Sequence, residues 1–234
     1  MTTFPPLQTQ RQRISLGDQV YEAIRDRIVT LTLPPGTMIY ENELAEMLQV
    51  SRTPIREAIR SLVNEQLLEV LPQRGTRIAP ISERKVHDTR FVREHLELGA
   101  FRLAARLWDA ERHRSVKAKL EELLQRQEAA AVAGDIAQFL NVDEAFHHAI
   151  LQVAGNETLL QVVGHMRAHL NRFRYLALQE LQQLERITAE HRLLAEAIEL
   201  GDEALAADRL GAHLGKLAQD LTVVRRKYPD YFTD

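Results

Sequence analysis

The chain of 234 residues is longer than one small domain usually needs and fits two domains. It contains no cysteine, which excludes disulfides, thiolate metal sites and cysteine nucleophiles and fits a reducing cytoplasm. No run approaches the roughly 20 apolar residues that span a bilayer, so we expect no membrane partner. The formal net charge of −3 gives no indication of nucleic-acid binding, so evidence for it has to come from where individual arginines lie.

The N-terminal third of the sequence predicts three short helices and a β-hairpin. Residues 1–13 are polar, with two prolines and two arginines, and we interpret them as a flexible tail. Beyond them, apolar residues recur at helical spacing in three short stretches, which a proline–glycine break at residues 34–36 and a polar stretch at Ser51 separate. Two short apolar runs then flank a turn at residues 72–75, as in a β-hairpin. Residues 14–80 therefore predict a winged helix-turn-helix domain.

The remaining residues, 81–234, predict a second domain that is all α-helical. Strand-like alternation stops after Ile81, and long amphipathic stretches follow. Gly201-Asp202 is typical of a glycine that ends one helix and an acidic residue that begins the next. The fold class is therefore mainly α: a winged helix-turn-helix followed by an antiparallel bundle of six or seven helices. The helices predicted for the bundle cover residues 83–108, 113–132, 135–153, 157–181, 185–199 and 202–227.

Two arginines at the start of the third predicted helix indicate DNA reading. Arg52 and Arg56 are four residues apart, so they share one helix face, opposite the apolar stripe of Ile55 and Ile59. In a helix-turn-helix this part of the helix enters the major groove, where arginine bonds guanine bidentately. An arginine pair on a helix is more often a solvated surface. Here the pair lies between a helix-turn signal and a hairpin with an arginine at its tip, and this combination favours the interpretation as a DNA-binding face.

Neighbouring residues complete the predicted DNA-binding set. Ser51 and Thr53 flank the helix start, where hydroxyl groups and the helix N-terminus bind phosphate. Ser51 is also the expected N-cap of that helix. Arg74 and Gly75 lie at the tip of the predicted hairpin, from which a wing reaches the adjacent minor groove. The predicted partner is therefore a double-stranded DNA operator.

The stretch from Glu43 to Ala58, ELAEMLQVSRTPIREA, resembles the signature of the GntR family of bacterial transcription regulators. Arg74-Gly75 matches the wing tip of that family, and the resemblance covers residues 16–80. Gln49 and Gln66 stand where the family often has glycine, a departure that affects turns and removes no contact. The DNA contacts that the resemblance implies are Arg52, Thr53, Arg56, Arg74 and Gly75, with Asn42 at a variable contact position.

Four polar side chains of the second domain lie on apolar helix faces. Asp143 and His147 are four residues apart on one stripe, and His191 and His213 fall on the stripes of two later helices. One carboxylate and three imidazoles therefore point toward the core, and this donor set suits Zn, Ni, Mn or Fe. A single buried histidine is more often a satisfied core residue, but four converging polar groups would each need a partner. The spacing leaves both a divalent metal site and a hydrogen-bonded polar core open.

Three other histidines of this domain are predicted to lie apart from that group. His148 is one residue off the stripe and should face elsewhere. His165 and His169 form a further pair four residues apart with no third partner, and we interpret them as pocket-lining or surface residues.

The second domain resembles the FCD ligand-binding domain of the FadR-like subfamily of GntR regulators. The resemblance implies a small organic-acid effector over a metal, with Arg93 as its charge partner, because an arginine fork matches a carboxylate. The alternative for Arg93 is a structural salt bridge with a neighbouring glutamate. The motifs that carry the resemblance are REHLE at 93–97, DEAFH at 143–147, Gly155-Asn156, Glu190-His191 and His213. The divalent metal ligands that it implies are Asp143, His147, His191 and His213.

Together these features predict a cytoplasmic, homodimeric transcription regulator that binds a palindromic operator. Most such regulators are repressors, and we expect repression here. Effector binding at the metal would change the spacing of the two recognition helices. One alternative is a constitutive DNA-binding regulator with a purely structural metal. Another is a metal-dependent hydrolase, in which an open coordination position activates water. No second carboxylate stands out as a general base for hydrolysis, so we expect no enzyme.

Overall fold

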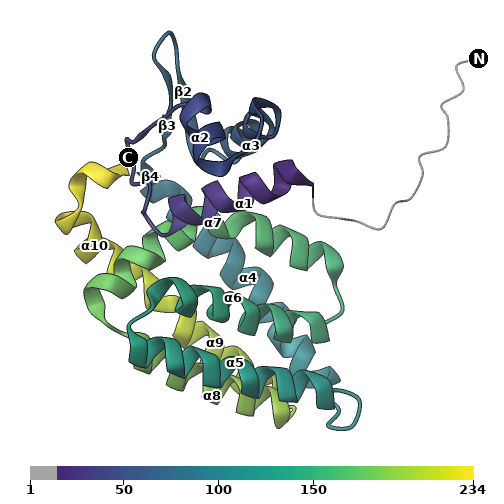
Figure 1. Cartoon of the computed structure of the whole chain (residues 1–234). Coiled ribbons are helices and arrows are strands. Elements are labelled where there is room, and N and C mark those ends of the chain that lie inside the picture. Colours follow the sequence, from purple (N-terminus) through teal and green to yellow (C-terminus); the bar gives the residue numbers. More distant parts are fainter. Residues whose placement is uncertain (1–14) are drawn as a thin grey trace, which may run out of the picture.

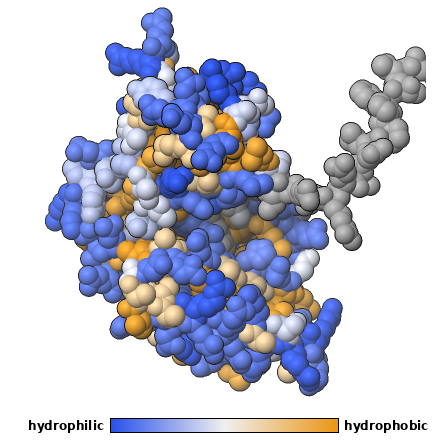
Figure 2. All heavy atoms as spheres, in the orientation of Figure 1, coloured by the Kyte–Doolittle hydropathy of each residue, from blue (hydrophilic) through white to orange (hydrophobic). Residues whose placement is uncertain are grey.

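The computed structural model describes residues 15–234, apart from the side chains of residues 165, 167, 218 and 219 (Figure 1). The tail predicted for residues 1–13 lies outside the described residues. Within the described chain, an N-terminal part with three helices and a small sheet sits on a larger helical part, which confirms the predicted mainly α fold (Figure 1). Hydrophilic residues predominate on the face that Figure 2 shows, and apolar residues form only small patches there.

The helices of the N-terminal part form because apolar residues repeat every three or four positions along them. Helix α1 (Leu16–Val29) begins with a capping box: the Ser15 hydroxyl accepts a hydrogen bond from the Asp18 amide, and the Asp18 carboxylate accepts one from the Ser15 amide. The buried face of α1 packs with α2 (Glu41–Leu48) and α3 (Arg52–Asn64) around a common apolar core. These three helices are the helix-turn-helix that the sequence predicts.

A three-stranded antiparallel sheet completes the winged helix. Strands β2 (Leu68–Leu71) and β3 (Gly75–Ile78) form the predicted hairpin, with Leu68 opposite Ile78. Strand β1 (Met38–Ile39) pairs with the other edge of β3. The sequence does not predict β1, because two residues are too few to show an alternating pattern.

The described residues of the second part form seven α-helices, as the sequence predicts to within one. They are α4 (Glu83–Leu107), α5 (Arg114–Ala133), α6 (Ile136–Val153), α7 (Glu157–Leu181), α8 (Leu184–Glu199), α9 (Glu203–Gly215) and α10 (Leu217–Lys227). None of the described helices is long and apolar enough to cross a membrane.

The single helix predicted over residues 202–227 is wrong, because the chain turns at Lys216 and forms α9 and α10 instead. Gly211 and Gly215 weaken the helix before this point. The Lys216 ammonium group donates to Glu190 of α8 at 2.5 Å, and α10 then packs against α7. A straight continuation of α9 would lose that packing.

The C-terminal residues return to the junction between the two parts. Strand β4 (Ile81–Ser82) pairs in parallel with β5 (Phe232–Thr233), which follows the short 3-10 helix η1 (Pro229–Tyr231). The Ser82 hydroxyl donates to the Asp234 carboxylate at 3.1 Å. Ile81 of β4 and Phe232 of β5 are buried in an apolar cluster with residues of α7 and α10, so α7 contacts the junction directly.

Candidate DNA-reading face and metal centre

The two predicted DNA-reading arginines lie on the exposed face of α3. The side chains of Arg52 and Arg56 are 55% and 52% exposed. Both donate to the same carboxylate oxygen of Glu41, at 3.1 and 2.8 Å. The hydrogen bond from Arg56 is the main reason that the pKa of Glu41 is lowered. Glu41 begins α2 and holds the two guanidinium groups together, a role that the sequence pattern does not reveal.

The other predicted DNA contacts are exposed as well. Thr53 lies in the first turn of α3, Asn42 lies in that of α2, and Arg74 lies in the wing turn. Gly75 has a φ of +110°, in the left-handed region that favours glycine. Ser51 takes the predicted N-cap position, but its side chain makes no capping hydrogen bond to the described residues of α3. Its hydroxyl therefore does not stabilise the helix in the free protein.

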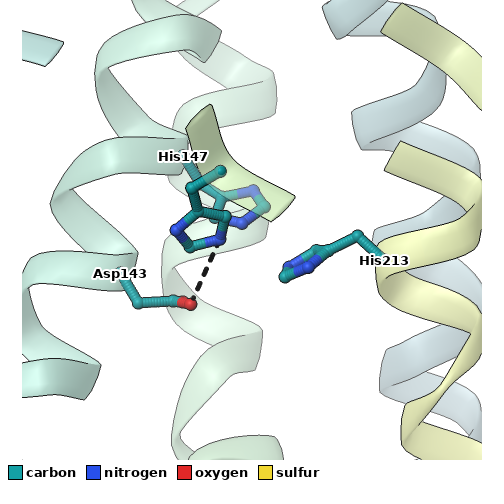
Figure 3. Close-up of side chains that lie close together, drawn as sticks. Asp143, His147 and His213 are labelled. Carbon is teal, nitrogen blue, oxygen red and sulfur yellow. Dashed lines mark ion pairs between the residues drawn. The ribbon is translucent and has the colours of Figure 1, made fainter. Parts of the chain in front are cut away.

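The four predicted metal ligands converge from three helices. Asp143 and His147 lie on α6, His191 on α8 and His213 on α9. The first three are fully buried and His213 is 8% exposed. One ligand atom from each lies within 4.8 Å of the others, and Nε2 of His191 is 3.5 Å from Oδ1 of Asp143. Asp143, His147 and His213 point toward a common space (Figure 3). The convergence inferred from helix spacing is confirmed.

Each of the three histidines is held in orientation by a side-chain oxygen atom that its Nδ1 contacts. Because carboxylate and amide oxygens only accept, each Nδ1 donates, and in a neutral ring this leaves the lone pair on Nε2. Outer partners of this kind are typical of metal-binding histidines. The pairs are His147 with Glu97 of α4 at 2.9 Å, His191 with Gln127 of α5 at 2.7 Å, and His213 with Glu190 of α8 at 2.9 Å.

Burial and charge keep the cluster in the protonation state that a metal requires. Burial lowers the pKa of His147 to about 4 and that of His191 well below its usual value, so both imidazoles are neutral at neutral pH. Burial favours a higher pKa for Asp143, but the positive charge of Arg174 on α7, together with the nearby His191 and His147, outweighs it and holds that pKa well below its usual range. The cluster therefore presents one carboxylate and the two neutral imidazoles of His147 and His191.

Four buried polar atoms of the cluster accept no well-aligned hydrogen bond from any described residue. They are both carboxylate oxygens of Asp143 and the Nε2 atoms of His147 and His191. Arg174 lies 2.7 Å from Oδ1 of Asp143, an ion-pair distance without hydrogen-bond alignment. Unpaired buried acceptors are rare, and acceptors cannot satisfy one another. The residues present therefore fit a divalent cation with nitrogen and oxygen ligands.

Arg93 is buried beside the cluster. It is 5% exposed, and its Nε donates to Oε1 of Glu97 at 2.7 Å. The structural salt bridge that the sequence leaves as an alternative is therefore present. Arg93 also lines a cavity of about 30 Å³ among α4, α7, α8, α9 and α10, together with Arg174 and His213. Its contact with an effector stays a prediction.

His148 and His169, which the sequence sets apart from the cluster, lie outside it. His148 is exposed, as predicted. His169 has a larger role than a pocket or surface residue, because its Nε2 contacts the backbone oxygen of Glu65 at the end of α3, 2.6 Å away. A backbone acceptor so distant in the chain leaves no sequence pattern, so this contact cannot be predicted. The side chain of His165 lies outside the described residues.

The fold and the two sites define a class of protein, the DNA-binding transcription regulators that carry a helical sensing domain. The family of bacterial regulatory proteins named gntR matches residues 16–78, and the FCD domain matches residues 88–216. The chain belongs to the GntR family and carries an FCD domain. Regulators of this family bind DNA operators, typically act as dimers and are not enzymes, so the hydrolase alternative is set aside.

The similar proteins match nearly the whole chain. An uncharacterized HTH-type transcriptional regulator in an unstable DNA locus of Streptomyces ambofaciens is 33% identical, over 91% of this chain and 88% of its own. The HTH-type transcriptional repressor RspR of Escherichia coli is 26% identical, over 94% of each chain. The solved structure of Escherichia coli McbR/YncC has a TM-score of 0.77 at 26% identity, over 92% of this chain and 100% of the other. Both domains therefore have counterparts in one regulator.

Proposed function

We propose that the chain is an effector-controlled repressor that acts as a homodimer on a palindromic operator. Residues 14–80 form the DNA-binding domain, and residues 81–234 form the sensing domain. The observation that carries the proposal is the buried cluster of acceptor atoms that fits a divalent metal ion. The proposed metal ligands are Asp143, His147, His191 and His213, with Arg93 at the effector. The proposed DNA contacts are Asn42, Ser51, Arg52, Thr53, Arg56, Arg74 and Gly75.

The cluster suits a bound ion that in turn recruits an organic acid. When bound, the ion supplies a coordination position for a carboxylate oxygen. The surrounding residues orient the ligands and keep the site dry. Glu97, Gln127 and Glu190 hold the imidazole rings in position, and the buried helices exclude bulk water. Zn, Ni, Mn and Fe all suit these donors.

Helix α7 supports the link between this site and DNA binding. Arg174 lies against Asp143, and Arg172, two residues earlier and fully buried, donates to the backbone oxygens of Ala79 and Pro80 in the junction, at 2.6 and 3.3 Å. Ala168, one turn earlier, belongs to the apolar core of the winged helix. A shift of α7 at the metal site would therefore move the junction and the DNA-binding domain together.

A repressor released by its effector is the direction of control that we favour. The support is that one relative, RspR, is named a transcriptional repressor. The competing proposal is a constitutive DNA-binding protein whose metal is structural. The two differ in a measurable way, because an effector can control DNA affinity only if it binds one arrangement of the dimer better than the other.

The test begins with selection of a high-affinity operator from random double-stranded DNA by the full-length protein. Operator affinity is then measured by fluorescence anisotropy for the metal-free protein, the Ni²⁺-loaded protein and the Ni²⁺-loaded protein with small carboxylic acids. We expect at least one acid to weaken operator binding by roughly 5- to 150-fold, the usual range of allosteric coupling. The same acid should act far less on the metal-free protein.

Three outcomes would each count against one part of the proposal. If Ni²⁺ binds but no acid changes either operator affinity or melting temperature, the metal is structural. If neither Ni²⁺ nor another of the four metals binds the protein, the sensing site is not a metal site. A selection that yields no preferred sequence would instead count against operator recognition.

A further inference from the structure

Arg174 is the cation most closely tied to the acidic ligand of the cluster. It projects from α7, is 5% exposed, and its Nη2 lies 2.7 Å from Oδ1 of Asp143. This is the only ion pair that Arg174 makes among the described residues. The same Asp143 oxygen lies 3.5 Å from Nε2 of His191, at the centre of the proposed metal site. Arg174 and a bound metal would therefore compete for one carboxylate.

Metal binding should release Arg174 from this pair. A divalent cation on Asp143 takes over the neutralisation of its charge and repels the guanidinium group. The released guanidinium would remain in a buried position, where an unpaired charge is strongly unfavourable. The protein therefore acquires, on binding the metal, an unmet requirement for an anion next to the metal.

The other cations that line the adjacent cavity already have carboxylate partners. Arg93 pairs with Glu97, whereas Arg186 and Lys216 both pair with Glu190, at 3.1 and 2.5 Å. None of these pairs includes a proposed metal ligand carboxylate, so metal binding does not disrupt them. Arg174 is thus the one lining cation, within the described chain, that the metal sets free.

The charges around the cavity indicate how much negative charge the occupant carries. Four cations line it and four carboxylates line it or pair with its cations, so the metal-free site is neutral. A divalent metal would bring a net charge of about +2 into a largely buried site, which a dianion offsets. The cations are Arg93, Arg174, Arg186 and Lys216, and the carboxylates are Glu97, Asp143, Glu190 and Asp220.

We infer that the effector is a dicarboxylate and that Arg174, released from Asp143 by the metal, anchors one of its carboxylates. This inference rests on the proposed function and names the ligand class of the same site. The cavity of about 30 Å³ has room for about one water molecule, so the ligand requires the cavity to open. Movement of Arg174 away from Asp143, on α7, is the first step of that opening.

Isothermal titration calorimetry on the full-length protein tests the inference directly. Ni²⁺ is titrated first, and the loaded protein is then titrated with malonate, succinate and glutarate, each against the monocarboxylate of equal chain length. We expect the best dicarboxylate to bind at least tenfold more tightly than its matched monocarboxylate. By linkage, that dicarboxylate should tighten Ni²⁺ binding by the same factor by which Ni²⁺ tightens its own binding.

The variant Arg174→Gln separates an anchoring role from a structural one. It should weaken dicarboxylate binding by roughly 10- to 100-fold, the usual effect of losing a charge-assisted hydrogen bond. Its affinity for Ni²⁺ should be unchanged or higher, because the competitor for Asp143 is gone. The control is Arg192→Gln on α8, whose partner Glu128 lies on the surface, and it should change neither affinity.

Each contrary result identifies which claim fails. Equal binding of dicarboxylates and monocarboxylates overturns the dianion and leaves the proposed function intact. Unchanged dicarboxylate binding by Arg174→Gln overturns the anchor. Loss of Ni²⁺ binding in that variant also overturns it, since Arg174 would then support the metal site itself. If the unmodified protein binds neither Ni²⁺ nor any of the other three metals, Zn, Mn and Fe, the proposed function and this inference fail together.

Discussion

The DNA-reading face and the Asp143 cluster both gather polar side chains, but they do so in opposite surroundings. Arg52 and Arg56 are about half exposed, and one carboxylate, Glu41, holds both. The cluster is almost entirely buried, and each histidine has its own outer partner. Exposed groups can be exchanged without unfolding the protein, whereas buried ones are bound into the core. The first region is therefore built for contact with a large partner and the second for a small one.

The largest expected effect is a loss of operator affinity at the exposed face of α3 without a matching loss of protein stability. The double variant Arg52→Ala/Arg56→Ala removes both predicted base contacts. Because each bidentate arginine–guanine pair contributes about 1–3 kcal/mol of discrimination, we expect a loss of about 2–6 kcal/mol in specific operator binding. Fluorescence anisotropy with a selected operator measures it. Thermal unfolding should change by no more than about 0.5 kcal/mol, since both side chains are exposed.

A surface arginine of the helical domain is the control for this variant. Arg114 on α5 is 75% exposed and pairs only with nearby Glu111 within the described chain. Arg114→Ala makes half the change in charge at a site far from the DNA-reading face, so operator affinity should stay the same. Operator binding retained by the double variant would contradict the assignment of α3 as the recognition helix.

The second effect concerns the buried cluster and the metal that it is proposed to hold. The variant His147→Ala/His191→Ala removes two of the four ligands. Elemental analysis of the purified protein should find metal in the unmodified chain and almost none in the variant. The metal-linked stabilisation, about 3 kcal/mol at a free metal concentration of roughly 100 times Kd, should disappear from thermal melts.

His148 offers a matched control, because it follows His147 on α6 but is exposed. His148→Ala should retain both the metal and its stabilising effect. Equal metal content in the double variant and the unmodified protein would show that the metal lies elsewhere.

A third prediction concerns the contact of His169 on α7 with the backbone oxygen of Glu65 at the end of α3. Burial and the nearby charge of Arg172 lower the pKa of His169 to about 4, against an ordinary value near 6.5 in the unfolded chain. Between these values the unfolded chain binds more protons than the folded one. The stability that neutral His169 contributes is therefore complete above about pH 6.5 and falls, by up to about 3 kcal/mol, as pH decreases toward 4.

The test compares the pH dependence of urea unfolding for the metal-free protein and for His169→Gln. The groups that face His169 are Arg172 of α7, Lys85 of α4 and the backbone oxygen of Glu65. None of these three groups titrates between pH 4 and 6.5, so the pH dependence in this range comes from His169 itself. The difference between the two proteins should grow steadily smaller from pH 6.5 to pH 4. A difference independent of pH would show that His169 stays exposed to solvent or is already charged.

The two regions also differ in how far the sequence predicts them. Helical spacing is enough to align Arg52 with Arg56 and to turn Asp143 and His147 inward, because residues four apart share a helix face. Spacing does not reveal contacts between helices that are far apart in the chain. Gln127, which orients His191 from α5, and Arg174, which pairs with Asp143 from α7, belong to this second kind.

The main features of the fold were predictable, and the exceptions have local causes. Each predicted helix follows from a long apolar stripe, but the break at Lys216 depends on packing of α10 against α7. Strands β1, β4 and β5 have two residues each, too few for a pattern. Gln49 and Gln66 keep the left-handed backbone, with φ of 54° and 59°, where glycine is usual, so the turns persist without it.

The smallest predicted effect is the change in operator affinity when Glu41, which pairs with both arginines of the exposed face, is replaced. In the free protein its carboxylate accepts hydrogen bonds from both arginines, and DNA must displace it before either guanidinium can reach a base. Exposed ion pairs are weak, so Glu41→Gln should raise operator affinity by about 0.5 kcal/mol, roughly twofold. The control is Glu46→Gln, which removes the same charge from the same helix at a residue with no ion pair in the described chain. It distinguishes loss of the ion pairs of Glu41 from a general decrease in repulsion between the protein and DNA phosphates. An equal gain in both variants would mean that Glu41 acts through net charge alone, whereas a loss confined to Glu41→Gln would mean that it positions the arginines for DNA.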